Sequence, residues 1–485
     1  MSGSVAWYAM VERNSTAPNY AAKEEIMMHL RAAVVRLGRR MLNAGLLLLA
    51  FFALSAVAVA QPVTEIQGSL PNGTQYLMRV PSNWNGVLIN DLDYRTNAGH
   101  ERYAALLSMG YGLAGTARRF DRTTHYNPVN EIQDLLAVQD LFAQQFGTPW
   151  RVLQYGHSGG GHVALAMAEM VPDRIDGAVV GCAHTPVWLM NTMLDGWFVA
   201  KSLIAPDLQI VGLPAPGTPE FSALTTAWRA AIDAAQSTPE GRARIALAIT
   251  LGQWPGWTTG AMPDIKDTHA LQLAMYATLR AAASQPGGQS RYMFEQSART
   301  FVASATGQLS WNTGVDYAAR FNLGNEFYKQ AVRDLYREAS LDLSAELAIV
   351  NAAPRISADS AALDFWSVHG RTVNGKPQVP LLRIHTVGDL SVPVNLVQGY
   401  DHAIRRNAKS DLYRTGIIEA TGHCTFTAAE SIAAIETLME RLDTGRWSST
   451  AQPKKLNDLG ESLHSSPSRY IHFDLEAYAR TWFPQ

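Results

Sequence analysis

The chain has 485 residues, which is too long for one compact core of the usual size and predicts either two domains or one domain with a large insertion. Lys and Arg together number 40 against 42 Asp and Glu, and only 17% of residues are charged. This balance provides neither a basic face for nucleic acid nor an acidic tail, so we expect a folded protein without a nucleic-acid partner.

The first 60 residues have the pattern of a secretory signal peptide. Basic residues including Arg36, Arg39 and Arg40 precede an apolar run at residues 46–60, which ends in the small residues Ala58 and Ala60. The run is short for a membrane span, and a single N-terminal anchor is the alternative. The pattern predicts cleavage near Ala60, no membrane association after cleavage, and a secreted or periplasmic protein.

Residues 61–184 alternate between strand and helix patterns. Strands are expected at 63–70, 74–81, 86–90, 111–116, 151–156 and 176–183, and helices at 101–110, 129–147 and 161–170. Asn130 is the expected N-cap of the second helix, and Gly147 is its expected end. Because the later strands are short, apolar and not alternating, we predict an α/β fold with a mostly parallel sheet covered by helices on both faces.

Strand patterns disappear between residues 185 and 378. Helical segments at 220–236, 268–283 and 325–339 are separated there by Pro and Gly. Alternation resumes in residues 379–485, with strands expected at 379–389 and 412–423 and a helix at 427–445. The simplest organisation is one α/β domain, residues 61–184 and 379–485, interrupted by a mainly helical cap at 185–378.

The stretch "YGHSGGG" places Ser158 between a predicted strand and a predicted helix. A G-x-S-x-G string is weak evidence by itself, and a glycine-rich turn that binds phosphate is the alternative. The strand-to-helix setting favours a nucleophile, because a tight turn there exposes the serine at the carboxyl edge of the sheet. Gly156 and Gly160 would allow the strand and the helix to pack closely around it.

A serine nucleophile needs a base and an orienting acid, which should follow later strands in the order acid, then histidine. Asp389 in "GDLSVP" follows the strand expected at 379–389, and His423 in "TGHCTF" follows the next strand. Three residues of the right type, in the right order and each at a strand exit, are hard to obtain by chance. We therefore predict a catalytic triad of Ser158, Asp389 and His423.

These motifs make residues 61–184 and 379–446 resemble the α/β hydrolases. The resemblance implies that the serine attacks a carbonyl, the histidine moves the proton and the aspartate orients the imidazole. It also implies an oxyanion hole formed by the backbone N–H groups of Gly159 and of Leu92, which lies in the loop "NDLDY". The chain departs from the common pattern there, since "IND" replaces the usual His-Gly.

The chain has two cysteines, Cys182 and Cys424. In an exported protein this pair predicts one disulfide, with two buried thiols as the alternative. Cys182 ends the strand after the nucleophile helix, and Cys424 follows His423. The arrangement resembles that of the tannase and feruloyl esterase group, in which a disulfide ties the residues next to the serine and the histidine, although His157 precedes Ser158 here. The resemblance supports a Cys182–Cys424 bridge that holds the histidine loop.

The motifs together predict a serine hydrolase of carboxylic esters that acts on a small to medium, partly apolar molecule through an acyl-enzyme. An aminopeptidase or amidase on the same fold and a lactonase are alternatives. A non-catalytic binding protein is least favoured, because all three triad residues are present. His162, His184 and His385 lack metal-ligand spacing, so we expect neither a metal nor a cofactor.

Overall fold

The computed structural model describes residues 62–484, except residue 216 and residues 284–300. The predicted leader at residues 1–60 therefore lies outside the described part of the chain. No helix in the described part has the length and apolar character needed to cross a membrane.

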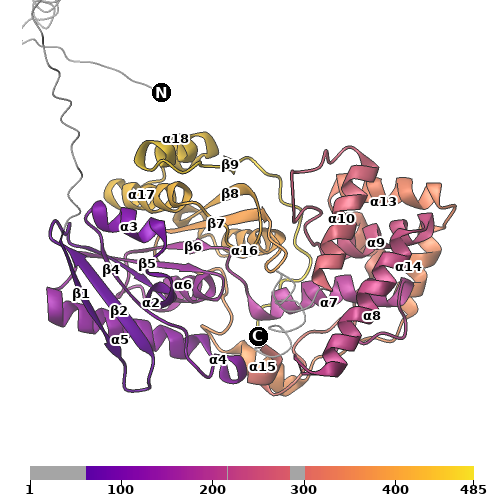
Figure 1. Ribbon diagram of the computed structural model, residues 1–485, viewed down its shortest axis with the longest axis horizontal. Helices are drawn as coiled ribbons and strands as arrows, with labels where there is room; N and C mark the ends of the chain where they lie inside the picture. The colour runs from indigo at the N-terminus through magenta and orange to yellow at the C-terminus, as the bar shows by residue number, and fades with distance from the viewer. Residues whose placement is uncertain (1–61, 216, 284–300, 485) are drawn as a thin grey trace, which may run out of the picture. The chain divides into compact units, whose positions relative to one another are not determined.

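Nine strands of the described chain form one sheet in the order β1-β2-β4-β3-β5-β6-β7-β8-β9 (Figure 1). The strands are β1 (Val63–Ser69), β2 (Gln75–Pro81), β3 (Val87–Asp91), β4 (Gly112–Thr116), β5 (Arg151–His157), β6 (Gly177–Gly181), β7 (Leu381–Gly388), β8 (Tyr413–Thr421) and β9 (Tyr470–Ile471). The six strands from β4 to β8 in this order run parallel, whereas β1, β2 and β9 pair antiparallel at the two edges. The predicted α/β sheet is therefore confirmed.

Helices cover both faces of this sheet (Figure 1). One face packs against α3 (Glu101–Ser108) and α17 (Ala428–Thr444), and the other packs against α5 (Pro128–Phe146), α6 (Gly159–Met170) and α16 (Asn395–Arg406). Strands β3 to β7 are buried along almost their whole length, because side chains on both faces contact helices. This burial explains why their sequences are apolar without alternation.

The start of α5 differs from the prediction that Asn130 is its N-cap. The cap is Asn127, whose side chain accepts a hydrogen bond from the Val129 N–H, and Pro128 occupies the first helical position. Proline is favoured there because its missing N–H would have no partner inside the helix. The predicted end at Gly147 is correct, and this glycine has a positive φ of 92°.

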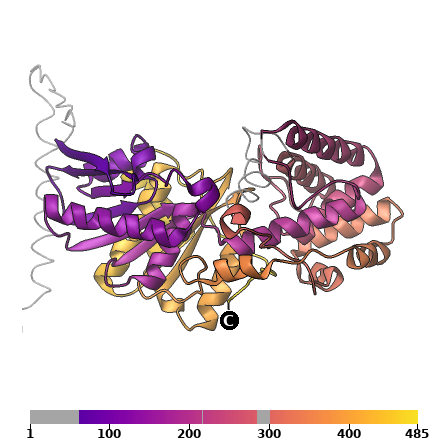
Figure 2. The same ribbon diagram turned by 90° about the horizontal axis from the view of Figure 1, so that it is seen from below.

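The segment between β6 and β7 is mainly helical (Figure 2). Its helices are α7 (Pro186–Leu203), α8 (Pro219–Gln236), α9 (Pro239–Gly252), α10 (Thr268–Ala282), α11 (Ala303–Ala305), α12 (Tyr317–Leu323), α13 (Glu326–Glu338), α14 (Leu343–Ala352) and α15 (Ser360–Ser367). Helix α9 is buried on nearly all sides by α7, α8, α10 and α13. The rings of Trp197, Trp228 and Trp254 pack edge to face at the centre of this helical segment, so these tryptophans form core.

The C-terminal segment after β9 packs back onto α7. The Trp188 indole donates to the carbonyl of Trp482 at 2.7 Å, and the Tyr478 hydroxyl donates to the carbonyl of Trp188 at 2.7 Å. Arg480 and Arg320 both form ion pairs with Asp195, whose side chain is fully buried. One carboxylate thus joins α7, α12 and the C-terminal segment.

We expect Asp195→Ala to lower the free energy of unfolding by about 3–5 kcal/mol, since it leaves two guanidinium groups in a buried site without their anion. Urea unfolding of the whole protein measures the change. Asp233→Ala is the matched control: Asp233 pairs with Arg280 between α8 and α10, but both side chains are partly exposed. The control should change the same quantity by less than about 1 kcal/mol. Equal effects of the two variants would contradict the role given to Asp195.

Candidate active site

Ser158 occupies a tight turn between β5 and α6. Its φ of 56° is positive, and its N–H donates to the Gly181 carbonyl at 3.0 Å. A Cβ on Gly156 would lie 2.3 Å from the Gly160 carbonyl oxygen, and a Cβ on Gly161 would lie 2.6 Å from the Gly181 oxygen. The nearest atom to a Cβ on Gly160 is 3.3 Å away, so the steric requirement for glycine falls on Gly156 and Gly161 more than on Gly160.

The structure brings the three predicted triad residues together. Nε2 of His423 lies 2.7 Å from the Ser158 hydroxyl oxygen, and Nδ1 of His423 lies 2.8 Å from Oδ2 of Asp389. Asp389 is fully buried, and the His423 side chain is 13% exposed, so the imidazole separates a buried carboxylate from a partly accessible hydroxyl. Such a chain of hydrogen bonds can take a proton from the serine and hold the resulting imidazolium.

The loop after β7 fixes the orientation of Asp389. Its Oδ1 accepts the N–H of Val392 at 3.0 Å, which leaves Oδ2 directed toward the histidine. Behind it, Nε2 of His385 lies 2.8 Å from the Val392 carbonyl oxygen. Burial lowers the pKa of His385 to about 4, so this second imidazole is neutral at pH 7 and serves as a hydrogen-bond donor within the loop.

The two predicted oxyanion donors lie at the same edge of the sheet. Gly159 is the first residue of α6, and Leu92 directly follows β3. The Leu92 Cβ lies 3.4 Å from the position of a Cβ on Gly160, so the β3 loop contacts the first turn of the helix. The next amide, that of Asp93, donates to Asp91 within the loop. The roles of Gly159 and Leu92 in binding an oxyanion stay a prediction.

Cys182 and Cys424 form a disulfide, with their Cα atoms 5.6 Å apart. Both residues have positive φ values, 38° and 56°, in loops that leave β6 and β8. Their sulfur atoms and His423 lie close enough together to suggest a metal site by distance alone. These atoms do not fit a metal ion, because the sulfurs are bonded to each other and both imidazole nitrogens of His423 contact triad partners.

His157 is part of the packing around the turn. Its ring lies between those of Tyr155 and Phe426, with centroid distances of 4.8 and 5.1 Å. A Cβ on Gly181 would lie 2.2 Å from this ring, so the imidazole fills the space between β5 and β6. Burial lowers its pKa well below the ordinary value, which keeps the ring neutral. His157 therefore fills space in the turn.

Two arginines near the turn were not predicted as site residues. A Cβ on Gly159 would lie 2.2 Å from a nitrogen of Arg122 and 3.3 Å from a nitrogen of Arg118. Both residues belong to "ARRFDR", which follows β4 at the carboxyl edge of the sheet. Their position after a central strand was the signal in the sequence that could have indicated them.

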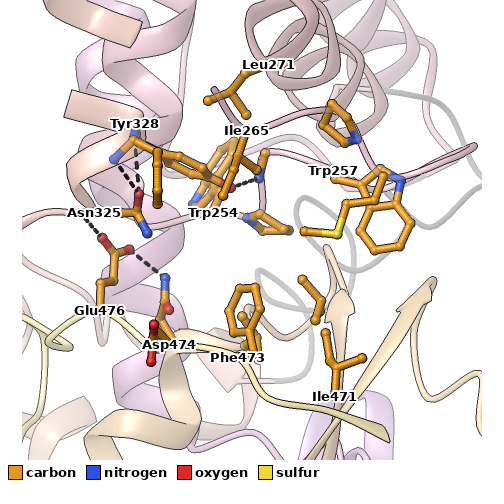
Figure 3. Close-up of a pocket in the computed structure, with 18 of the residues that line it drawn as sticks. Trp254, Trp257, Ile265, Leu271, Asn325, Tyr328, Ile471, Phe473, Asp474 and Glu476 are labelled. Atoms are coloured by element: carbon orange, nitrogen blue, oxygen red, sulfur yellow. Dashed lines mark hydrogen bonds between the residues drawn. The ribbon is translucent and has the colours of Figure 1, made fainter. Parts of the chain in front are cut away.

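A cavity of about 300 Å³ lies between the helical segment and the C-terminal segment (Figure 3). Trp254 and Tyr328 from the helical segment face Ile471 and Phe473 of the C-terminal segment across it. Glu476 closes one side and accepts hydrogen bonds from the Asn325 N–H and the Asn395 amide, and burial raises the pKa of Glu476 to about 7. The residues that line the cavity include none of the triad, so the bond to be cleaved is not placed in this cavity.

The strand order, together with a serine at the β5–α6 turn and an acid and a histidine after β7 and β8, defines an α/β hydrolase. The chain is 46% identical over 448 residues to the o-phthalyl amidase of Xanthobacter agilis, a similarity that covers 87% of this chain and 97% of that protein. The chain therefore belongs to the same family of hydrolases as this amidase.

The similarity to solved structures is much more distant. An esterase of Pyrococcus furiosus superposes with a TM-score of 0.34 at 12% identity, covering 80% of this chain and 91% of that one. Feruloyl esterase B of Aspergillus oryzae superposes with a TM-score of 0.35 at 14% identity, covering 79% and 80%. No protein-family model matches the chain.

We expect the double variant Cys182→Ala, Cys424→Ala to be less stable than the parent by about 2–5 kcal/mol, because the bridge closes a loop with a sequence separation of 242. Hydrolase activity should also fall, since Cys424 adjoins His423. Urea unfolding and initial rates measure the two effects, and a reductant added to the double variant is the control that should change neither. A double variant with the parent's stability and rate would show that the bridge does not hold the histidine loop.

Proposed function

We propose that the protein is a serine hydrolase that cleaves the amide bond in amides of o-phthalic acid. The observation that carries the proposal is the continuous hydrogen-bonded chain from Ser158 through His423 to Asp389. It occurs in a chain 46% identical to an o-phthalyl amidase along nearly the whole length of both proteins. The geometry supports the reaction type, and the relative's name supports the acyl group and the amide bond.

In this proposal the Ser158 oxygen attacks the amide carbon while Nε2 of His423 takes its proton. The N–H groups of Gly159 and Leu92 stabilise the negative charge that forms on the carbonyl oxygen. His423 then gives the proton to the leaving amine as the carbon–nitrogen bond breaks, which leaves an acyl-enzyme. A water molecule repeats the sequence and releases the phthalic acid, with Asp389 orienting the imidazole in both halves.

Esters of the same acid are a second class of substrate. The triad geometry that supports amide cleavage serves ester cleavage equally, and an ester's alcohol leaves more readily than an amine. An aminopeptidase is less well supported, because it needs carboxylates near the nucleophile to bind a free amine. In the helical segment, the carboxylates of Glu220, Asp264 and Asp267 are exposed, and Asp267 caps α10.

Wild-type protein should hydrolyse the monoanilide of phthalic acid, and Ser158→Ala should lower kcat by more than about 10⁴-fold because it removes the nucleophile. Asp389→Asn should lower kcat by a similar factor, since the amide favours the wrong imidazole tautomer. The rate of aniline release measures cleavage of the anilide, and the rate of hydrolysis of monophenyl phthalate measures cleavage of the ester. Ser202→Ala, at the last turn of α7, is the control and should match the parent. Turnover of neither substrate by the parent, or unchanged turnover by Ser158→Ala, would overturn the proposal.

We also propose that the protein is exported. The basic residues and apolar run at residues 31–60 support a cleaved signal, and the Cys182–Cys424 bridge suits an oxidising compartment. Expression of the full chain in a bacterial host should give periplasmic or secreted protein whose N-terminal sequence begins near Gln61. Full-length protein retained in the membrane fraction would favour the alternative of an uncleaved anchor.

A further inference from the structure

Arg118 and Arg122 direct guanidinium nitrogens toward the residue that follows the proposed nucleophile. The nitrogen closest to a Cβ on Gly159 is Nη2 of Arg122, at 2.2 Å, and Nη1 of Arg118 is 3.3 Å away. Two cationic groups therefore occupy the space beside the first amide of α6. This is the amide that the proposed mechanism assigns to the oxyanion.

Carboxylates hold both guanidinium groups in place: Glu131 is buried, whereas the Asp93 side chain is 13% exposed. Asp93 contacts Nε and Nη2 of Arg118 at 2.6 and 2.7 Å, and Glu131 contacts Nη1 of Arg122 at 2.6 and 2.8 Å. The nitrogens nearest Gly159 are thus different from those that the carboxylates contact. Burial alone would raise the pKa of Asp93, but Arg118 lowers it below its ordinary value, so this ion pair is intact at pH 7.

Aromatic rings lie next to these guanidinium groups. The Arg122 guanidinium stacks 4.0 Å from the ring centroid of Tyr126, and this ring also packs against His184, Phe301 and Trp366. Nδ1 of His184 is buried and has no hydrogen-bond partner among the described residues. Burial, reinforced by His162 and by Arg122 and Arg118, lowers the pKa of His184 well below its ordinary value, so its ring is neutral. A buried aromatic cluster and an unsatisfied polar atom therefore adjoin the two cations.

We infer that Arg118 and Arg122 recognise a carboxylate on the acyl group, borne by the ring carbon next to the one that carries the scissile carbonyl, while the cluster of Tyr126 and His184 contacts the aromatic ring. Because the guanidinium nitrogens adjoin Gly159, a carboxylate that they bind must lie next to the carbonyl whose oxygen meets the Gly159 amide. An ortho substituent satisfies this condition, and a para substituent points away. The inference rests on the proposed function and adds the residues that select the substrate.

The test compares three anilides: phthalic monoanilide, its para isomer terephthalic monoanilide, and neutral benzanilide. Arg118→Gln removes one guanidinium, and Arg122→Gln is combined with Glu131→Gln so that no buried carboxylate loses its partner. We expect both variants to lower kcat/KM for phthalic monoanilide by about 10- to 100-fold relative to terephthalic monoanilide and benzanilide. This is the size expected for the loss of a hydrogen bond to a charged group, and the change should lie mainly in KM. Arg119→Gln is the matched control. Arg119 is the neighbour of Arg118 and pairs with Asp134 in the same two-point manner, at 2.7 and 2.9 Å, so this variant should leave the ratio unchanged.

A binding measurement separates this inference from the proposed function. Calorimetry with phthalate and with benzamide on Ser158→Ala protein needs no turnover. We expect phthalate to bind more tightly than benzamide, and Arg118→Gln in this background to weaken phthalate binding by about 10-fold. That result would support the inference even if no anilide were cleaved. The inference would be overturned by equal binding of phthalate and benzamide, or by variants whose kcat/KM ratios between the three anilides match those of the parent. An equal loss of kcat on all three anilides would also overturn it, because it would assign the arginines to the oxyanion instead.

Discussion

The active edge of this protein depends on one backbone constraint, the positive φ of Ser158. A non-glycine residue in that region is strained by about 1–3 kcal/mol and persists only where its surroundings determine it. Here the Ser158 N–H is held by the Gly181 carbonyl, and the absence of side chains at Gly156 and Gly161 lets β5, β6 and α6 approach that closely. The same contacts present the serine oxygen to His423, so strain in the turn and the geometry of the triad have a common origin.

Similar strain recurs at the residues that hold the histidine. Cys182 and Cys424 also have positive φ values, and their bridge ties the loop after β6 to the loop after β8. The Cys182 N–H donates to the Ile384 carbonyl of β7, the strand that leads to Asp389. The loops carrying the serine, the acid and the base are thus connected through β6 by hydrogen bonds and one covalent link. A change in the conformation of one loop should therefore alter the conformation of the other two.

The fold and the triad could be predicted because parallel strands bring their carboxyl ends to one edge. Ser158, Asp389 and His423 each follow an apolar strand, and the sequence pattern alone shows that placement. Helices α7 and α9 had weaker signals, since burial on nearly all sides removes the amphipathic period. Arg118 and Arg122 could not be recognised from charge alone, because a basic cluster in a loop is usually solvated. Only the space beside Gly159 shows where their nitrogens point.

The helical segment and the active edge share a short connection. Helix α7 begins at Pro186, four residues after Cys182, and His184 lies between them with its ring stacked on His162 of α6. The middle of α7 carries Asp195, the anion that holds Arg320 and Arg480. Because α7 is a continuous helix, the position of its first turn beside the disulfide is coupled to the buried ion pairs at Asp195, nine residues further along the helix. The helical segment therefore supports the loop at the active edge.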